Sequence, residues 1–230
     1  MEIFIKFIFS SMLILITTAT NASPVILYNT FGPDDDFSTK NSNSGFSADI
    51  GLNPYTLEQQ KVANGFSISS GFVDITLESI EVALSNPRNN DGSNRVTLTL
   101  HNDLGGVPGA AIESLSVELA PKYSHQMYFI ESATNPTLFA GSNYWLVASA
   151  LDPMSELGWL WNGIAPWNTD TGPRLSYRSG DGIWKDRSKY GQQAFRINAN
   201  ATVVPTPSSV ILFVGSLLCL AGRHRLSERE

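Results

Sequence analysis

The sequence has little of several residue types on which common functions depend. Its 230 residues include one cysteine and three histidines. A single cysteine cannot form a disulfide within the chain, and no zinc site can be assembled from cysteine pairs. Charged residues make up 16%, below the roughly 25% of an ordinary soluble domain. The formal net charge of −6 argues against nucleic acid as a partner, because binding to phosphates needs basic side chains.

The sequence patterns of common enzymes are also missing. The chain has no G-x-S-x-G, no G-x-x-x-x-G-K-[ST] and no H-E-x-x-H. His101 and His125 lie in the central part of the sequence, and neither belongs to such a pattern. We therefore expect no enzymatic activity and no cofactor.

The first 22 residues are typical of a secretory signal peptide. Lys6 supplies a positive charge, and Phe7 to Ile16 form a short apolar run. Thr20-Asn21-Ala22 then offers the small residues that a signal peptidase recognises. A buried first strand or a membrane anchor is the alternative, but the run is shorter than the ~20 residues that span a bilayer. Residues 1–22 are therefore predicted to direct export.

The other end of the chain is also apolar. Val210 to Ala221 form a hydrophobic segment, and Arg223 and Arg225 follow it. Basic residues directly after such a segment hold that end in the cytoplasm. A buried or amphipathic helix is the alternative, but Val210 to Leu220 has no polar face. The segment is predicted to be a short hydrophobic helix that holds the protein in the membrane before processing.

The order of these features resembles the PEP-CTERM sorting signal of Gram-negative bacteria. The matching residues are Val204, Pro205, Thr206 and Pro207, the apolar segment, and Arg223 with Arg225. The resemblance implies that an exosortase-type membrane enzyme is a partner. It also implies delivery to the cell envelope, outer surface or extracellular matrix. Thr206 stands where the signal usually has a glutamate.

Strand patterns dominate residues 23–200. Val96, Leu98 and Leu100 alternate with threonines, as in a half-buried strand. Ile75 and Leu77 are out of phase with Ile80, Val82 and Leu84, which predicts a bulge or break near Glu78-Ser79. One weakly helical stretch runs from Pro54 to Ala63. The sequence predicts an all-β domain, an antiparallel β-sandwich of jelly-roll-like form. An N-terminal signal helix and a short hydrophobic helix within the C-terminal segment, residues 201–230, would flank it.

Several sequence segments of this domain resemble the bacterial choice-of-anchor R domain. The resemblance implies an all-β extracellular domain that different bacteria attach through different C-terminal anchors, and it implies no established activity. The segments are Asn29–Pro33, Gln60–Phe66, Leu104–Gly109, Asn135–Leu138, Gly141–Ala148 and Ala194–Arg196.

All five tryptophans fall between positions 145 and 184. Trp145 lies in an apolar strand and is expected in the core. Trp159, Trp161, Trp167 and Trp184 are candidates for stacking against sugar rings, because flat aromatic faces suit amphipathic ligands. Trp159 and Trp161 are two residues apart, so in a strand their side chains would point to the same face. The alternative is that these rings are packed within the domain.

Acidic loop residues are weak candidates for Ca²⁺ binding. Asp34 and Asp36 follow Gly32-Pro33, and Asp91 lies in an Asn-Asp-Gly turn. Calcium loops need ligands that converge, whereas adjacent side chains point apart. We therefore expect these carboxylates to be solvated loop residues that bind no metal ion.

Together these features predict an exported envelope or matrix protein with a structural or adhesive role. The alternative is a carbohydrate-binding module that acts on extracellular polysaccharide through the tryptophan-rich loops. A secreted hydrolase is the weakest reading, since the sequence does not show the carboxylate separation that glycoside hydrolysis requires.

Overall fold

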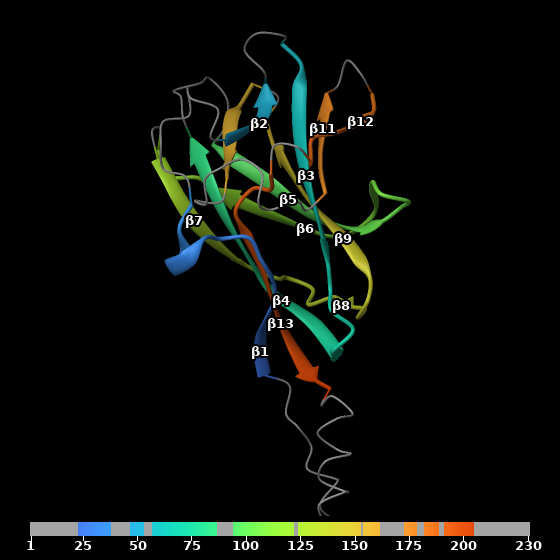
Figure 1. Ribbon diagram of the computed structural model, residues 1–230. Helices are drawn as coiled ribbons and strands as arrows, with labels where there is room; N and C mark the ends of the chain where they lie inside the picture. The colour runs from blue at the N-terminus through green and yellow to red at the C-terminus, as the bar shows by residue number, and fades with distance from the viewer. Residues whose placement is uncertain are drawn as a thin grey trace, which may run out of the picture.

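The structure is a computed structural model, shown in Figure 1. It describes residues 23–37, 47–52, 57–86, 94–121, 124–152, 154–161, 173–178, 182–188 and 191–204.

These residues form thirteen β-strands and one short 3₁₀ helix, η1 (Pro33–Asp35). The strands are β1 (Ser23–Asn29), β2 (Ser47–Leu52), β3 (Gln59–Ser67), β4 (Phe72–Asn86), β5 (Arg95–Asp103), β6 (Pro108–Glu118), β7 (Ser124–Glu131), β8 (Thr137–Leu138), β9 (Asn143–Ala150), β10 (Glu156–Leu160), β11 (Arg174–Arg178), β12 (Trp184–Asp186) and β13 (Phe195–Val203).

The prediction of an all-β, antiparallel fold is confirmed. Every pairing between the strands is antiparallel, from the long β4–β13 ladder to the short β11–β12 pair. The expected signal helix and C-terminal hydrophobic helix fall in residues 1–22 and 205–230, which lie outside the described residues.

The strands belong to one continuous sheet with two extended halves. In the first half, β13 pairs with β1 and β4, and β4 also pairs with β7 and β8. In the second half the order is β3-β9-β5-β6, with β11 and β12 on the free side of β3. The bridge between the halves is narrow: β10 joins β4 through two residue pairs, and β2 joins β3 through two. The described strands thus form one large antiparallel open sheet, where a sandwich was expected (Figure 1).

The main core cluster draws on both halves. Ile80 of β4 and Ile197 of β13 come from the first half, and Leu98 of β5 and Leu146 of β9 come from the second. All four side chains are buried. Burial of such apolar surface is the main favourable term in folding. The cluster therefore ties the two halves to each other.

The predicted irregularity in β4 is confirmed as a bulge. Asn198 of β13 pairs with Ser79, but the next residue, Ala199, pairs with Leu77. Glu78 is therefore an extra residue in β4. The bulge places Leu77 and Ile80 on the same buried face, although their spacing in the sequence is odd.

The helical expectation for Pro54 to Ala63 is wrong over its second half. Gln59 to Ala63 belong to β3, which pairs with β9 on one edge and with β11 on the other. Val62 is buried in the main core and Ala63 in a smaller cluster. Packing on both faces of the strand overrides the weak helical preference of Leu-Glu-Gln-Gln-Lys. Residues 53–56 lie outside the described residues.

A buried carboxylate joins β6 to the turn that follows β7. Glu113 is 6% exposed. Its Oε1 accepts hydrogen bonds from Ala133 N at 2.8 Å, Thr134 N at 2.8 Å and Thr134 Oγ1 at 3.0 Å. Its Oε2 accepts one from Ser132 Oγ at 2.7 Å. We call this arrangement the Glu113 clasp. β6 belongs to the second half of the sheet and β7 to the first, so the clasp links the halves.

The hydrogen bonds of the clasp favour the charged form of Glu113. Burial by itself raises the pKa of this carboxyl group, but the hydrogen bonds from Ser132, Thr134 and Ala133 outweigh it. They hold the pKa below its usual value of 4.5. The clasp is therefore complete at neutral pH.

We predict that Glu113→Gln destabilises the protein by about 1–3 kcal/mol at pH 7, because one acceptor oxygen is replaced by an amino group that faces donors. Since the folded-state pKa is lowered, the stabilisation by Glu113 is full above the unfolded pKa of about 4.3 and is lost as pH falls through the folded value. Urea unfolding at pH 7 and pH 3.5 measures both effects, and the difference between variant and wild type should shrink at pH 3.5.

Glu118→Gln is the matched control for this change. Glu118 lies on the same strand but forms an exposed salt bridge with Arg95 at 3.4 Å. Exposed pairs contribute about 0–1 kcal/mol, so this variant should unfold close to wild type. Equal losses in the two variants would contradict a special role for the clasp.

Candidate functional site

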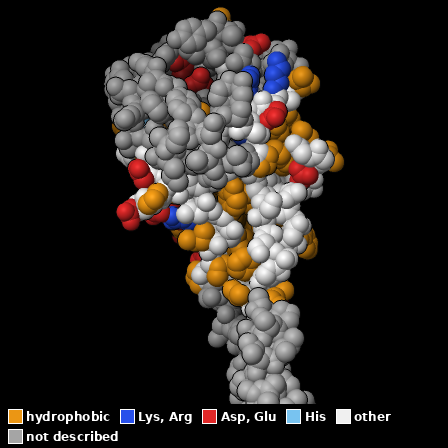
Figure 2. All heavy atoms as spheres, viewed as in Figure 1, with side chains coloured by type: hydrophobic (Ala, Val, Ile, Leu, Met, Phe, Trp, Pro, Cys, Tyr) orange, Lys and Arg blue, Asp and Glu red, His pale blue; other side chains and the backbone are white. Residues whose placement is uncertain are grey.

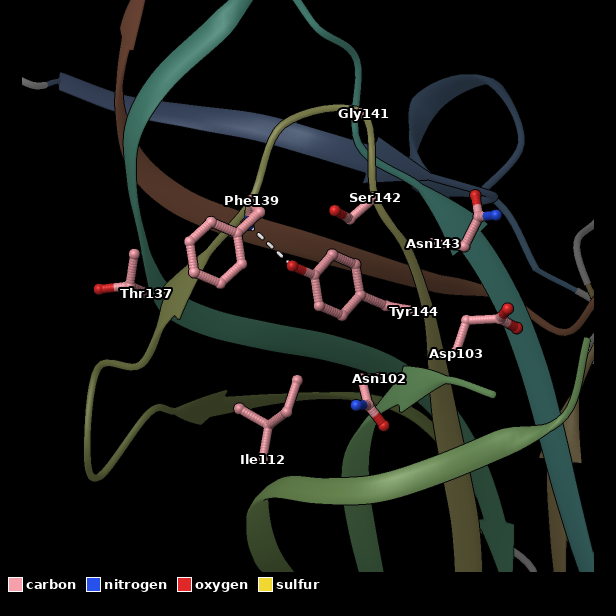
Figure 3. A pocket seen from close by; sticks show the side chains of 9 residues that line it. All are labelled: Asn102, Asp103, Ile112, Thr137, Phe139, Gly141, Ser142, Asn143 and Tyr144. Atoms are coloured by element: carbon pink, nitrogen blue, oxygen red, sulfur yellow. Dashed lines mark hydrogen bonds between the residues drawn. The ribbon is translucent and has the colours of Figure 1, made fainter. Parts of the chain in front are cut away.

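An open groove of about 560 Å³ lies where β5 and β8 end and β9 begins. This volume is within the roughly 300–1,000 Å³ of small-ligand pockets. We call it the Phe139 groove, and Figure 3 shows its side chains. It is lined by Asn102, Asp103, Ile112, Thr137, Phe139, Gly141, Ser142, Asn143 and Tyr144.

The Tyr144 side chain holds the backbone of the groove's aromatic rim. Its ring is buried in the main core, and its hydroxyl accepts a hydrogen bond from Phe139 N at 2.7 Å (Figure 3). Gly141 N donates to Ile68 O at 2.8 Å, and Gly141 has a φ of 73°, a conformation that favours glycine. Phe139 thereby stays 67% exposed on a fixed backbone. The groove presents a flat apolar ring to solvent.

Two amide side chains of the groove are positioned by neighbours. Asn143 Oδ1 accepts a hydrogen bond from Ser67 Oγ at 2.6 Å, which leaves the two Nδ2 donors and one further acceptor position on Oδ1. Asn102 lies close to Gly109, where an added Cβ would be 2.4 Å from Asn102 Oδ1. Glycine at position 109 therefore makes room for the Asn102 amide.

Asp103 is the acidic residue of the lining, and hydrogen bonds hold its carboxylate on the Trp145 side of β5, pointing away from Phe139 (Figure 3). Trp145 Nε1 donates to Asp103 Oδ1 at 2.6 Å. Gly106 N lies 3.2 Å from each carboxylate oxygen. Gly105 and Gly106 have φ values of 64° and 88°, so the β5–β6 turn that supplies this N–H favours glycine at both positions.

A smaller hollow of about 200 Å³ lies across β1, β13, β4 and β7. Exposed Ile26 and Phe129 line it, and Ser79 and Asn198 lie between them in the sheet. Figure 2 shows apolar side chains gathered on the lower part of the molecule, where β1 and β13 lie in Figure 1. Asn198 Nδ2 already donates to Ser79 Oγ at 3.1 Å and to Glu81 Oε1 at 2.7 Å. This hollow therefore has fewer free hydrogen-bonding groups for a polar ligand than the Phe139 groove has.

The structure corrects one predicted glycan contact. Trp159 is 0% exposed, its Nε1 donates to Ala194 O at 3.1 Å, and its ring packs against Phe195 with centroids 5.8 Å apart. It is a core residue, because β10 lies inside the sheet between β4 and β2. Trp145 is also buried, as expected, with 2% exposure.

Trp161 and Trp184 are both partly buried. The Arg174 guanidinium lies 5.4 Å from the ring centroid of Trp161, within cation–π range. Trp184 packs against the cluster of Ala63, Trp145, Val147 and Leu175, and its ring centroid is 5.5 Å from that of Tyr177. Both rings contact protein groups and keep partial exposure. Trp167 lies outside the described residues.

Buried amides surround the backbone bridge of Trp161. Trp161 pairs with Gln193, whose N–H donates to Asn64 Oδ1 at 3.3 Å. Asn64 and Gln193 are 0% exposed. Within the described part of the chain, Asn64 Nδ2 and both polar ends of the Gln193 side chain have no hydrogen-bond partner. Ordered water is the usual partner of such groups.

The acidic candidates do not converge on a common point. Asp34 and Asp36 are exposed, and Asp35 between them forms an ion pair with Arg196. Across the described ranges, no group of three or more histidine, cysteine, aspartate or glutamate side chains is placed to hold a metal ion. Asp91 lies outside these ranges.

The predicted sorting residues Pro205, Thr206, Pro207, Arg223 and Arg225 also lie outside the described residues. Val204 is the last described residue, and its N–H donates to Gly71 O at 2.9 Å. Within the described part of the chain, no helix has the length and apolar character needed to cross a bilayer.

The sequence prediction missed the Phe139 groove. Its residues come from three separate stretches, 102–103, 112 and 137–144, which the β5–β6, β5–β9 and β4–β8 pairings and the Glu113 clasp bring together. The available signals were the glycine-rich turn at 104–109 and the polar Gly-Ser-Asn before Tyr144. Both signals are equally typical of ordinary turns.

Comparisons with known proteins give little further information. No family model matches the sequence, and no curated protein matches it. The chain is similar to the structure of the cysteine protease and lectin-like domains of Cwp84, a surface layer associated protein of Clostridium difficile. That match has 12% sequence identity and a TM-score of 0.41, and covers 68% of this chain and 36% of that chain. The chain thus spans about a third of the length of that structure, and the function proposed below rests on the groove itself.

We predict that Gly109→Ala displaces the Asn102 side chain and lowers stability by about 1–3 kcal/mol. The closest obstacle to the new Cβ is the end of the Asn102 side chain, which can rotate away, but Leu104 Cβ at 3.0 Å and Asn102 O at 3.2 Å must also shift slightly. The side-chain amide signals of Asn102 in a ¹⁵N NMR spectrum should shift. Gly71→Ala is the control, because its Cβ would meet its nearest neighbour at 3.7 Å. Unchanged Asn102 signals in Gly109→Ala would contradict the proposed packing.

Proposed function

We propose that this chain is an exported surface or matrix protein with an adhesive role, and that its β-domain binds extracellular polysaccharide through the Phe139 groove. The single observation that carries the binding proposal is an exposed aromatic ring, fixed by its backbone, beside uncharged hydrogen-bonding side chains. Phe139 supplies the ring, and Asn102, Thr137 and Ser142 supply the polar groups.

This combination matches the chemistry of a saccharide. One face of a sugar ring carries C–H groups that pack against an aromatic ring, and its edge carries hydroxyls that both donate and accept hydrogen bonds. A pocket with mostly apolar contact and a few positioned polar groups is typical of ligand sites. The Tyr144–Phe139 hydrogen bond positions the ring backbone in advance, which reduces the entropy lost on binding.

Export and attachment complete the proposal. Residues 1–22 act as the signal peptide, residues 23–200 form the exported domain with its jelly-roll-like sandwich, and residues 201–230 act as the sorting and anchor segment. The PEP-CTERM resemblance supports an exosortase as processing partner, and the choice-of-anchor R resemblance supports an extracellular β-domain. The site is proposed to bind its ligand without catalysis.

We predict that Phe139→Ala weakens polysaccharide binding about three- to tenfold, which corresponds to the ~0.5–1.5 kcal/mol of an aromatic contact. A glycan array should first identify a ligand for residues 23–204, and calorimetry should then compare the variants. Phe129→Ala is the control, because Phe129 is a similarly exposed phenylalanine, 60% against 67%, on the other hollow. Equal losses in both variants would place binding elsewhere.

We predict that Thr206→Glu raises processing of the C-terminus if an exosortase recognises this signal, since glutamate is the usual residue there. Replacement of Arg223 and Arg225 by glutamate should disturb orientation and export, because the positive charge no longer holds that end in the cytoplasm. Fractionation and mass spectrometry of the C-terminus in hosts with and without the exosortase test both. An intact tail that persists equally in both hosts would contradict this partner.

A further inference from the structure

Five of the described strands pair with a single neighbour, and four of them carry features that discourage further pairing. β1 contains Pro24 and a register shift after Ile26. β6 contains Pro108, register shifts and the buried charge of Glu113. β8 and β12 have only two and three residues. Proline, bulges, inward-pointing charges and short length are the usual means by which a sheet edge is blocked.

The fifth such strand, β7, has none of these features. Its eight residues include no proline, glycine, lysine or arginine. Its pairing with β4 runs from Glu131 opposite Ser79 to Ser124 opposite Asn86 without a register shift. β7 lies at the margin of the fold (Figure 1). The strand therefore presents a regular row of backbone N–H and C=O groups along its outer edge.

One face of β7 is apolar at its centre. Successive side chains of a strand alternate between its faces, so His125, Met127, Phe129 and Glu131 share one face. Met127 is 41% exposed and Phe129 is 60% exposed. Tyr128, on the opposite face, packs against the main core. Exposed apolar side chains on an unblocked edge are typical of a strand that pairs with another chain.

This face of β7 is self-complementary in an antiparallel arrangement. A twofold axis through Tyr128 places Met127 opposite the partner's Phe129, and His125 opposite the partner's Glu131. Both pairs occur twice, once on each side of the axis. A thioether packs well against an aromatic ring, and an imidazole N–H donates to a carboxylate. Registers centred on Met127 or Phe129 instead place His125 or Glu131 opposite an apolar side chain.

We infer that two copies of this chain pair through β7 to form a twofold dimer. The antiparallel sheet continues from β4 through both β7 strands to the partner's β4. The dimer itself does not depend on glycan binding. It would carry two Phe139 grooves, so that one polysaccharide chain is held at two points or two chains are held together, which suits an adhesive role.

The test compares two double variants of the full chain by sedimentation equilibrium in density-matched detergent. Met127→Lys with Phe129→Lys places like charges opposite each other in the inferred register. Met127→Lys with Phe129→Glu places opposite charges there. Both variants replace the same exposed side chains, so both should fold alike, and thermal unfolding checks this.

Wild type should be dimeric and should dissociate on dilution. The variant with two lysines should raise the dissociation constant of the dimer about tenfold or more, because like charges directly opposite each other are unfavourable across strands. The variant with lysine and glutamate should stay within about threefold of wild type, since opposite charges are a favourable cross-strand pair.

Ile26→Lys is the control for an exposed apolar residue elsewhere on the same half of the sheet. Ile26 is 54% exposed on β1, which pairs with β13 and not with β4. This variant should dimerise as wild type does.

A wild type that stays monomeric overturns the inference, and so does equal association of the two double variants. Loss of the dimer in Ile26→Lys alone would place the interface on β1 and also overturn it. Glycan binding by a monomeric wild type would leave the proposed function intact.

Discussion

The geometry of the groove depends on one buried carboxylate. The hydrogen bonds from β10 and β2 join the halves of the sheet through only a few residue pairs, and beside the shared core a further link lies on the β6–β7 side. Glu113 provides it by accepting four hydrogen bonds from the 132–134 turn. That turn leads directly into β8 and Phe139, and Ile112 beside Glu113 lines the groove. The link that closes the fold therefore also sets the distance between the two walls of the groove.

Much of the fold could be predicted because strand periodicity is a local property. Val96, Leu98 and Leu100 alternate in the sequence and are all buried in β5. The change of phase between Leu77 and Ile80 marked the bulge at Glu78. The stretch Gln59 to Ala63 was misread, since its polar residues resemble a helix and only pairing on both edges shows a strand. The single continuous sheet was likewise beyond local patterns, because the short β10 and β2 contacts connect distant parts of the chain.

The site was harder to predict than the fold, because exposure depends on tertiary position. Trp159 and Trp161 are two residues apart, yet the first is wholly buried and the second only partly so. Phe139, in contrast, follows a two-residue strand and has no aromatic neighbour in sequence, so no pattern singled it out. The Tyr144 hydroxyl, five residues away in sequence, holds the Phe139 backbone where the ring is exposed. Aromatic composition alone therefore does not show which rings reach solvent.

The pairing of β1 with β13 has a mechanical consequence. Ser23 lies opposite Ala201, so the first and last described strands begin and end at the same edge of the molecule. β13 lies between β1 and β4, and a tension applied at Val203 runs along the strand while its hydrogen bonds run across it. Rupture would require the ladders on both sides to yield together in shear, rather than one bond at a time. A pulling force at this end therefore acts along the strands, the direction in which the sheet resists rupture most strongly.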